Sequence, residues 1–214
     1  MAARFRRLRG GGVSIGFTEQ EAELLRAMLT DLDALLGSLD DDPNNSANSA
    51  RADGSDGSDG SDGSGDPAGA GAAAEPDPLA VMVGIGTATS APEDPALARL
   101  FPDGYTDDDA ASADFRRYTQ AGLRDARRLR IATALTTLGA DARRRHVLDA
   151  EAAQAWLGVL NDLRLVLGER LEVTEDLDGM LAAMAPADPR RAALGVYDWL
   201  GWVQETLVRA LMRA

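Results

Sequence analysis

The side chains in this sequence that could do chemistry on a small molecule are few and scattered. The chain of 214 residues has one histidine, His146, and no cysteine, which excludes thiol catalysis, disulfides and thiolate metal sites. His146 has no second histidine with which to hold a metal ion. We therefore assign no catalytic, cofactor-binding or metal-binding residue and expect a protein that is not an enzyme. The alternative, a metal-independent enzyme, would need several acids to converge around His146.

Arginine gives the strongest signal for binding. From Arg116 to His146 the sequence has nine arginines and two aspartates, a net charge of +7. At about 100° per residue, the arginines within the predicted helix there occupy one sector. Such a face could bind DNA or an acidic protein, and the alternative is a solvated helix face. The candidate partner-binding arginines are Arg116, Arg117, Arg124, Arg127 and Arg128.

Two tryptophans in the closing stretch "YDWLGWVQETLVRALM" are further candidates for partner binding. With Leu200 at the centre of the core face, Trp199 lies about 100° to one side and Trp202 nearly opposite. We predict that Trp199 is buried. Trp202 is either buried in a helix that is wrapped on several sides or exposed as an anchor for a partner.

The N-terminal elements that must position these residues are a β-hairpin and a helix. Val13, Ile15 and Phe17 alternate, and three glycines at 10–12 supply a turn, which predicts a hairpin over 4–17. Thr18 and Glu21 form the pattern of a capping box that begins a helix. The predicted core face of this helix is Leu25, Met28, Leu29, Leu32, Leu35 and Leu36.

Further helices are predicted in the C-terminal two thirds. Acid-then-proline pairs at 77–78 and 94–95 begin two short helices. A long helix follows from about 108 to 138, with a candidate break near 119–122. Phe115, Tyr118, Ala126 and Leu129 lie on one face, opposite the arginines. "RRRHVLD" suggests a third short strand near 145–148. Asp149 begins a helix with core residues Ala153, Trp156, Leu157, Leu160, Leu163, Leu167 and Leu171. Asp188-Pro189 begins the last, at 189–213, with Ala193, Val196, Leu200, Val203, Leu207 and Leu211 facing the core.

The segment 40–76 differs from the rest in composition. The net charge of the chain is −13, and residues 40–78 contribute ten acids against one arginine. The segment has no large apolar residue, so we expect a disordered acidic Gly/Ser/Asp insertion. Its repeat "DGSDGSDGSDG" lacks the bidentate glutamate of an EF-hand, which favours a solvated spacer over a calcium site. The predicted organisation is the hairpin and first helix at 1–39, the insertion at 40–76 and the helical remainder of one domain at 77–214.

Three segments resemble one known family. "AWLGVLNDLRLVLGERLEVTED" at 155–176, "YDWLGWVQETLVRALM" at 197–212 and "PEDPALARLFPDGYTDDD" are similar to the AosR-like actinobacterial proteins, oxidative-stress transcriptional regulators once catalogued as a domain of unknown function. The resemblance implies a small cytoplasmic regulator that contacts the transcription machinery, with a sigma factor as the suggested partner. It also implies redox sensing by a cysteine pair, which this chain lacks.

Together these observations predict a mainly α protein, a helical bundle-like domain with a small N-terminal antiparallel β-hairpin. No stretch approaches the roughly 20 apolar residues of a membrane span, so we expect a cytoplasmic protein. The primary hypothesis is a non-enzymatic regulator that binds a protein partner. The alternative is direct DNA binding by the Arg116–Arg130 face.

Overall fold

The computed structural model describes residues 4–9, 12–39, 91–139 and 145–212. The described elements are β1 (Arg6–Arg7), β2 (Val13–Ile15), α1 (Glu19–Gly37), α4 (Pro95–Leu100), α5 (Asp109–Leu138), β3 (His146–Leu148), α6 (Ala150–Arg170), α7 (Leu177–Ala183) and α8 (Arg190–Met212). The mainly helical class with a small sheet is confirmed. The predicted helix at Asp77-Pro78 and the insertion at 40–76 lie outside the described residues.

The sheet is antiparallel with strand order β1-β2-β3, so the predicted third strand is confirmed. In the β2–β3 register, Val13 pairs with Leu148 and Ile15 with His146. Gly12 begins the return strand with a positive φ of 76°. A Cβ there would lie 2.8 Å from the Leu148 carbonyl oxygen, so the turn requires glycine for space as well as conformation.

Side-chain caps fix where the helices begin. At α1 the Thr18 hydroxyl accepts from the Glu21 N–H, and the Glu21 carboxylate accepts from the Thr18 N–H, which confirms the capping box. Asp94 caps α4 and Asp149 caps α6, as the sequence predicts. Each cap satisfies donors that an α-helix leaves unpaired at its first turn.

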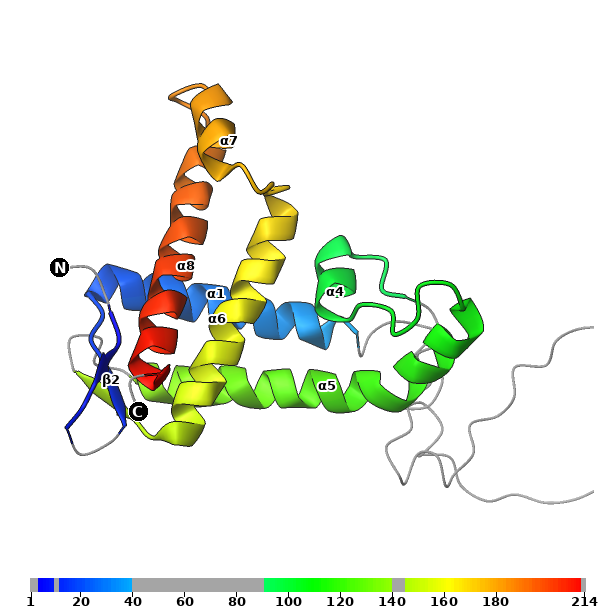
Figure 1. The fold of residues 1–214 in the computed structure, drawn as a ribbon, viewed down its shortest axis with the longest axis horizontal. Helices are drawn as coiled ribbons and strands as arrows, with labels where there is room; N and C mark the ends of the chain where they lie inside the picture. The colour runs from blue at the N-terminus through cyan, green and yellow to red at the C-terminus, as the bar shows by residue number, and fades with distance from the viewer. Residues whose placement is uncertain (1–3, 10–11, 40–90, 140–144, 213–214) are drawn as a thin grey trace, which may run out of the picture.

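The core surrounds α6, which packs against α4, α5 and α8. Trp156 on α6 is fully buried, stacks on Phe17 at 5.6 Å between ring centroids and meets Phe5 edge-on at 6.1 Å. Figure 1 shows α6 and α8 side by side, crossing α1 and α5. The core faces predicted for α1, α6 and α8 are confirmed, except that Leu171 and Ala193 are only half-buried and lie outside the core cluster.

The two ends of the described chain meet at the sheet. The Phe5 N–H donates to the Thr206 hydroxyl of α8 at 3.1 Å, a contact between residues 201 positions apart. The hairpin is therefore fixed by the last helix as well as by its own pairing, which a short hairpin requires. None of the helices in the described ranges is long and apolar enough to cross a membrane.

Candidate functional site

The long helix α5 lies with its arginine side toward the rest of the molecule. Its buried residues are Ser112, Arg116, Gln120, Ile131, Ala134 and Leu138. The apolar face predicted from periodicity points to solvent instead, with Phe115, Tyr118 and Leu129 all exposed. The expectation of an outward arginine face is therefore wrong in orientation, although the residues do share faces as predicted. The suggested break near 119–122 is also absent, because α5 is continuous.

A buried carboxylate on α6 explains the orientation of α5. Asp162 is 2% exposed and forms ion pairs with Arg127 and, at 3.5 Å, with Arg130. Arg127 also donates to the Leu100 carbonyl at 2.7 Å and lies over the Phe101 ring. A buried charge is tolerated when it is paired and hydrogen-bonded. Turning the arginines of α5 outward would leave Asp162 without its partners.

The first half of α5 is held by the loop that precedes it. Arg116 is buried and forms an ion pair with Asp103. The Ser112 hydroxyl donates to the Tyr105 carbonyl at 2.7 Å and accepts from the Tyr105 N–H at 3.2 Å. These contacts explain why polar residues occupy the inner side of this part of the helix.

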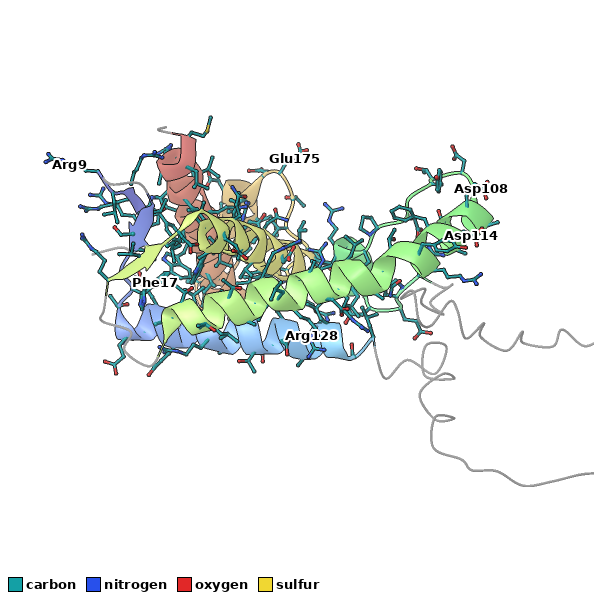
Figure 2. The ribbon with its side chains drawn as sticks, turned by 90° about the horizontal axis from the view of Figure 1, so that it is seen from below. Arg9, Phe17, Asp108, Asp114, Arg128 and Glu175 are labelled. Carbon is teal, nitrogen blue, oxygen red and sulfur yellow. The ribbon has the colours of Figure 1, made fainter. Side chains whose placement is uncertain are left out.

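The remaining arginine candidates are half-buried or exposed on α5. Arg128 forms an ion pair with Asp33 of α1 at 3.0 Å, and Figure 2 shows it between the two helices. Arg124 pairs with the neighbouring Asp125, and Arg117 lies over the Tyr118 ring at 5.7 Å. The five candidate arginines therefore do not form a single open surface. Their role in partner binding stays a prediction.

The outward side of α5 carries a row of exposed apolar residues, which we call the outer stripe: Phe115, Tyr118, Ala126 and Leu129. Tyr118 is 58% exposed and Leu129 68%. These four residues recur at spacings of three, eight and three positions, so they follow one side of the helix. Single exposed apolar residues are ordinary, but a row along one helix face is typical of a binding surface.

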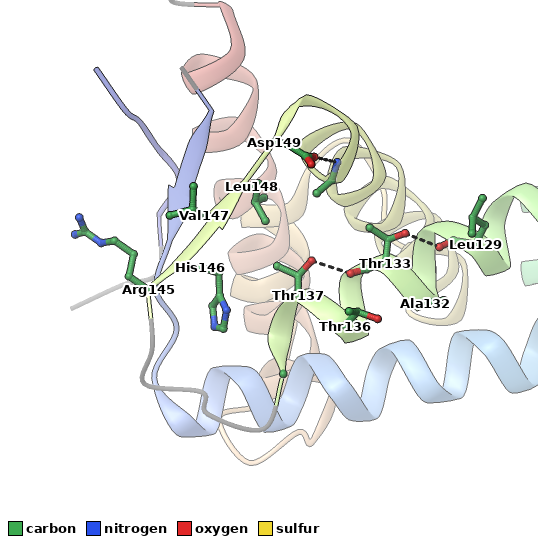
Figure 3. A pocket seen from close by; sticks show the side chains of 12 residues that line it. Leu129, Ala132, Thr133, Thr136, Thr137, Arg145, His146, Val147, Leu148 and Asp149 are labelled. Atoms are coloured by element: carbon green, nitrogen blue, oxygen red, sulfur yellow. Dashed lines mark hydrogen bonds between the residues drawn. The ribbon is translucent and has the colours of Figure 1, made fainter. Parts of the chain in front are cut away.

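Two grooves meet at Leu129 and Thr133. The first, of about 790 Å³, lies between the second half of α5 and β3, and is lined by His146, Val147 and Ala152 among others (Figure 3). The second, of about 660 Å³, runs across the outer side of α6 between α5 and Gln204 of α8. The end of the outer stripe is therefore a ridge with a hollow on either side.

Among the described residues that line the groove beside β3, His146 is accompanied by one carboxylate, that of Asp149, which caps α6. The hydroxyls of Thr133 and Thr137 donate to carbonyls one turn earlier in α5, at 2.9 and 2.7 Å. Among the residues that the structure describes, no group of three His, Asp or Glu is placed to hold a metal ion. The hydrogen bonds given for these two groove residues lie within α5.

The tryptophans divide between core and surface. Trp199 is half-buried and packs against the core, so its predicted burial is confirmed only in part. Trp202 lies on the outer side of α8 with 36% of its surface exposed. Whether Trp199 or Trp202 contacts a partner stays a prediction.

Sequence reasoning missed Asp162 and the outward position of Leu129. A signal for Asp162 was present, because it interrupts a second apolar row on α6 formed by Ala155, Val159 and Val166. An acid within such a row points to a buried partner of opposite charge.

Comparison with known proteins assigns the chain to a family. Residues 2–211 match the family described as "Domain of unknown function (DUF2017)". The "Putative oxidative stress regulator AosR" of Mycobacterium leprae is 35% identical over 150 residues, which cover 64% of this chain and 67% of that protein. The "Oxidative stress regulator AosR" of Mycobacterium tuberculosis is 35% identical over 154 residues, with the same coverage. The predicted resemblance is confirmed. No solved structure matches the chain significantly.

Proposed function

The chain belongs to the DUF2017 family, and from this membership and the exposed face of α5 we propose that it is a cytoplasmic regulator that binds a protein of the transcription machinery. Relatives at 35% identity are named oxidative stress regulators, which supports a regulatory role in the same response. A sigma factor is the partner that we would test first. We further propose that the chain does not catalyse a reaction.

The observation that carries this proposal is the outer stripe with its two grooves. Tyr118 and Leu129 expose more than half of their surface, and turning them toward the core would require a rotation of α5 about its axis. The ion pairs of Arg127 and Arg130 with Asp162 oppose that rotation. Binding of an amphipathic helix or a similar apolar surface from a partner would bury the stripe, and apolar burial is the main favourable term in association.

Charged residues at the edge of the stripe support selectivity. Asp114 and Asp125 lie along its margin, Arg128 pairs with Asp33 of α1, and Arg117 lies over the Tyr118 ring. Rim charges of both signs favour a partner with complementary charges and affect the association rate more than the affinity. Arg117, Arg128 and the separate Trp202 therefore remain candidate contacts, whereas Arg116 and Arg127 would act by holding α5 in place.

The stimulus in this proposal does not act on a thiol of this chain, because the chain has no cysteine. Regulation would then come from the amount of the protein or from its partner. This differs from the cysteine-pair sensing that the family resemblance implies.

The test is a binding assay with purified RNA polymerase and individual purified sigma factors of the host. In the full-length protein, Leu129→Asp should lower affinity at least about tenfold, because loss of a hot-spot contact costs about 2 kcal/mol or more and a new carboxylate would be buried in the interface. Met212→Asp is the matched control, since Met212 is also apolar and is 78% exposed on α8. Equal melting temperatures would show that both variants are folded.

Three results would separate the candidate surfaces. Loss of binding in Leu129→Asp alone supports the outer stripe. Loss only in Trp202→Ala would move the interface to α8, and loss only in an Arg117→Ala/Arg128→Ala pair would restrict it to the charged edge. If none of the purified transcription proteins binds the wild-type chain, the proposed partner class is wrong.

A further inference from the structure

A second surface, independent of the proposed protein-binding function, lies between β1 and the end of α8. A cavity of about 390 Å³ is lined there by Arg4, Phe5, Arg6, Arg7, Thr206, Arg209 and Ala210. Four of its seven lining residues are arginines. We propose that this cavity binds the phosphate backbone of a nucleic acid.

The arginines of the cavity are presented by a fixed backbone. Phe5 is buried, meets Trp156 edge-on, and its N–H donates to the Thr206 hydroxyl. Arg6 and Arg7 form β1 and pair with Ser14 and Val13 of β2. Because both neighbours hold the strand, the backbone that carries these arginines is already in place when a ligand binds. A pre-organised site loses less entropy when it binds.

The charge of this site is not neutralised within the described part of the chain. Residues 4–9 contain four arginines and no acid. Arg4, Arg6 and Arg7 are exposed and form no ion pair with a described carboxylate, and Arg209 pairs with Glu205 at 2.5 Å on the surface. The candidate arginines of α5 other than Arg117, by contrast, are paired with carboxylates. Within the described part of the chain, the hairpin therefore presents a positive surface that carboxylates do not neutralise.

The lining favours phosphate over an acidic peptide. A peptide that adds to a sheet edge needs free strand donors and apolar pockets for its side chains. Beside α8 the Phe5 N–H is already bonded to Thr206, and the apolar lining residues Phe5 and Ala210 are buried. The Thr206 hydroxyl already donates to the Val203 carbonyl, so the arginines remain as the ligand-binding groups of the cavity. Arginine forks are a usual contact of nucleic-acid phosphates.

The row of arginines is also longer than one anion requires. Arg9 continues it beyond the cavity, and Figure 2 shows this residue projecting from the outer end of the hairpin. Because successive side chains of a strand point to opposite faces, Arg6 and Arg7 carry their charges on both sides of β1. Charges spread in this way suit an extended polyanion better than one free phosphate ion. No base-reading element is identified, so the expected binding is independent of sequence.

The experiment is fluorescence anisotropy of the full-length protein with a labelled 20-base-pair duplex and a 20-nucleotide single strand, at low salt and over a salt titration. Arg6→Ala/Arg7→Ala should weaken binding at least about tenfold and reduce the slope of log affinity against log salt by about two, one for each lost phosphate contact. Arg99→Ala/Arg190→Ala removes the same charge elsewhere and should change affinity less than about twofold. Arg209→Ala weakens the site from α8 without altering the hairpin.

Four outcomes would overturn the proposal. They are no binding of wild-type protein to either nucleic acid at low salt, equal losses in the site and control pairs, displacement of the nucleic acid by polyglutamate at equal charge, and displacement by millimolar inorganic phosphate. The third would assign the site to an acidic protein and the fourth to a free anion. Leu129 does not line this cavity but the groove beside β3. Leu129→Asp should therefore leave nucleic-acid binding unchanged.

Discussion

Replacing Asp162 with asparagine tests what holds α5 in its observed orientation. The substitution keeps the size of the side chain and removes its charge. Asp162 is almost completely buried, and its two partners, Arg127 and Arg130, lie on α5. If the buried carboxylate directs the arginines inward, its loss should destabilise the whole domain.

The magnitude follows from how well the two arginines can adjust. Removing one member of a buried ion pair costs about 3–5 kcal/mol, because the remaining charge loses its partner. The Arg130 side chain is 34% exposed and can turn toward water. Arg127 keeps its hydrogen bond to Leu100 and its place over the Phe101 ring. We therefore expect the low end of the range, about 3 kcal/mol, which for a domain of this size lowers Tm by roughly 6–12 °C.

The assay is urea and thermal unfolding of the full chain, with Asp33→Asn as the matched control. Asp33 also pairs with an α5 arginine, Arg128, but both side chains are about 40% exposed, at 39% and 43%. An exposed pair contributes less than about 1 kcal/mol. If Asp162→Asn and Asp33→Asn lose the same small amount of stability, the buried carboxylate does not determine how α5 packs.

Three further predictions concern stability and oxidation. Trp156→Ala should lower the free energy of unfolding in urea by about 3–5 kcal/mol, because the side chain is fully buried among aromatic rings. A decrease below about 1 kcal/mol would show that neighbouring side chains fill the space left by the indole. Burial raises the pKa of Asp94, but the hydrogen bond and charge of Arg170 and the cap donors outweigh it, so that pKa lies below its usual value. The Tm deficit of Asp94→Asn should therefore be present at about pH 7 and disappear as the pH falls below about 4; a deficit independent of pH would contradict this. Diamide, a thiol oxidant, should not change the Tm of the purified protein, since the chain has no cysteine; a shifted Tm would contradict this.

Local chemistry made most of the fold predictable. Several short-range hydrogen-bond patterns are specified by nearby residues and are present in the structure. They are the capping box of Thr18 and Glu21, the helix caps of Asp94 and Asp149, and the strand pairing around Val13. The apolar rows of α1, α6 and α8 are strong enough to identify their buried sides. These features depend on neighbours within a few residues, which a single sequence displays.

The direction of α5 could not be predicted in the same way. Periodicity shows which residues share a face, but not which face is inside. On α5 the choice depends on Asp162 and Asp103, which lie 35 and 13 residues from their arginine partners. Without the tertiary arrangement, aromatic Phe115 and Tyr118 are the better core candidates on hydrophobicity alone. Paired charges override that preference here.

The bond between Phe5 and Thr206 has a consequence for how the protein is made. The first strand leaves the ribosome long before α8 exists, yet its buried contacts include both Trp156 of α6 and the last helix. Translation must therefore proceed beyond residue 206 before the hairpin acquires its final packing, and contacts so distant in sequence form slowly. A nascent chain that lacks α8 would expose Phe5 and its neighbours to chaperones and proteases.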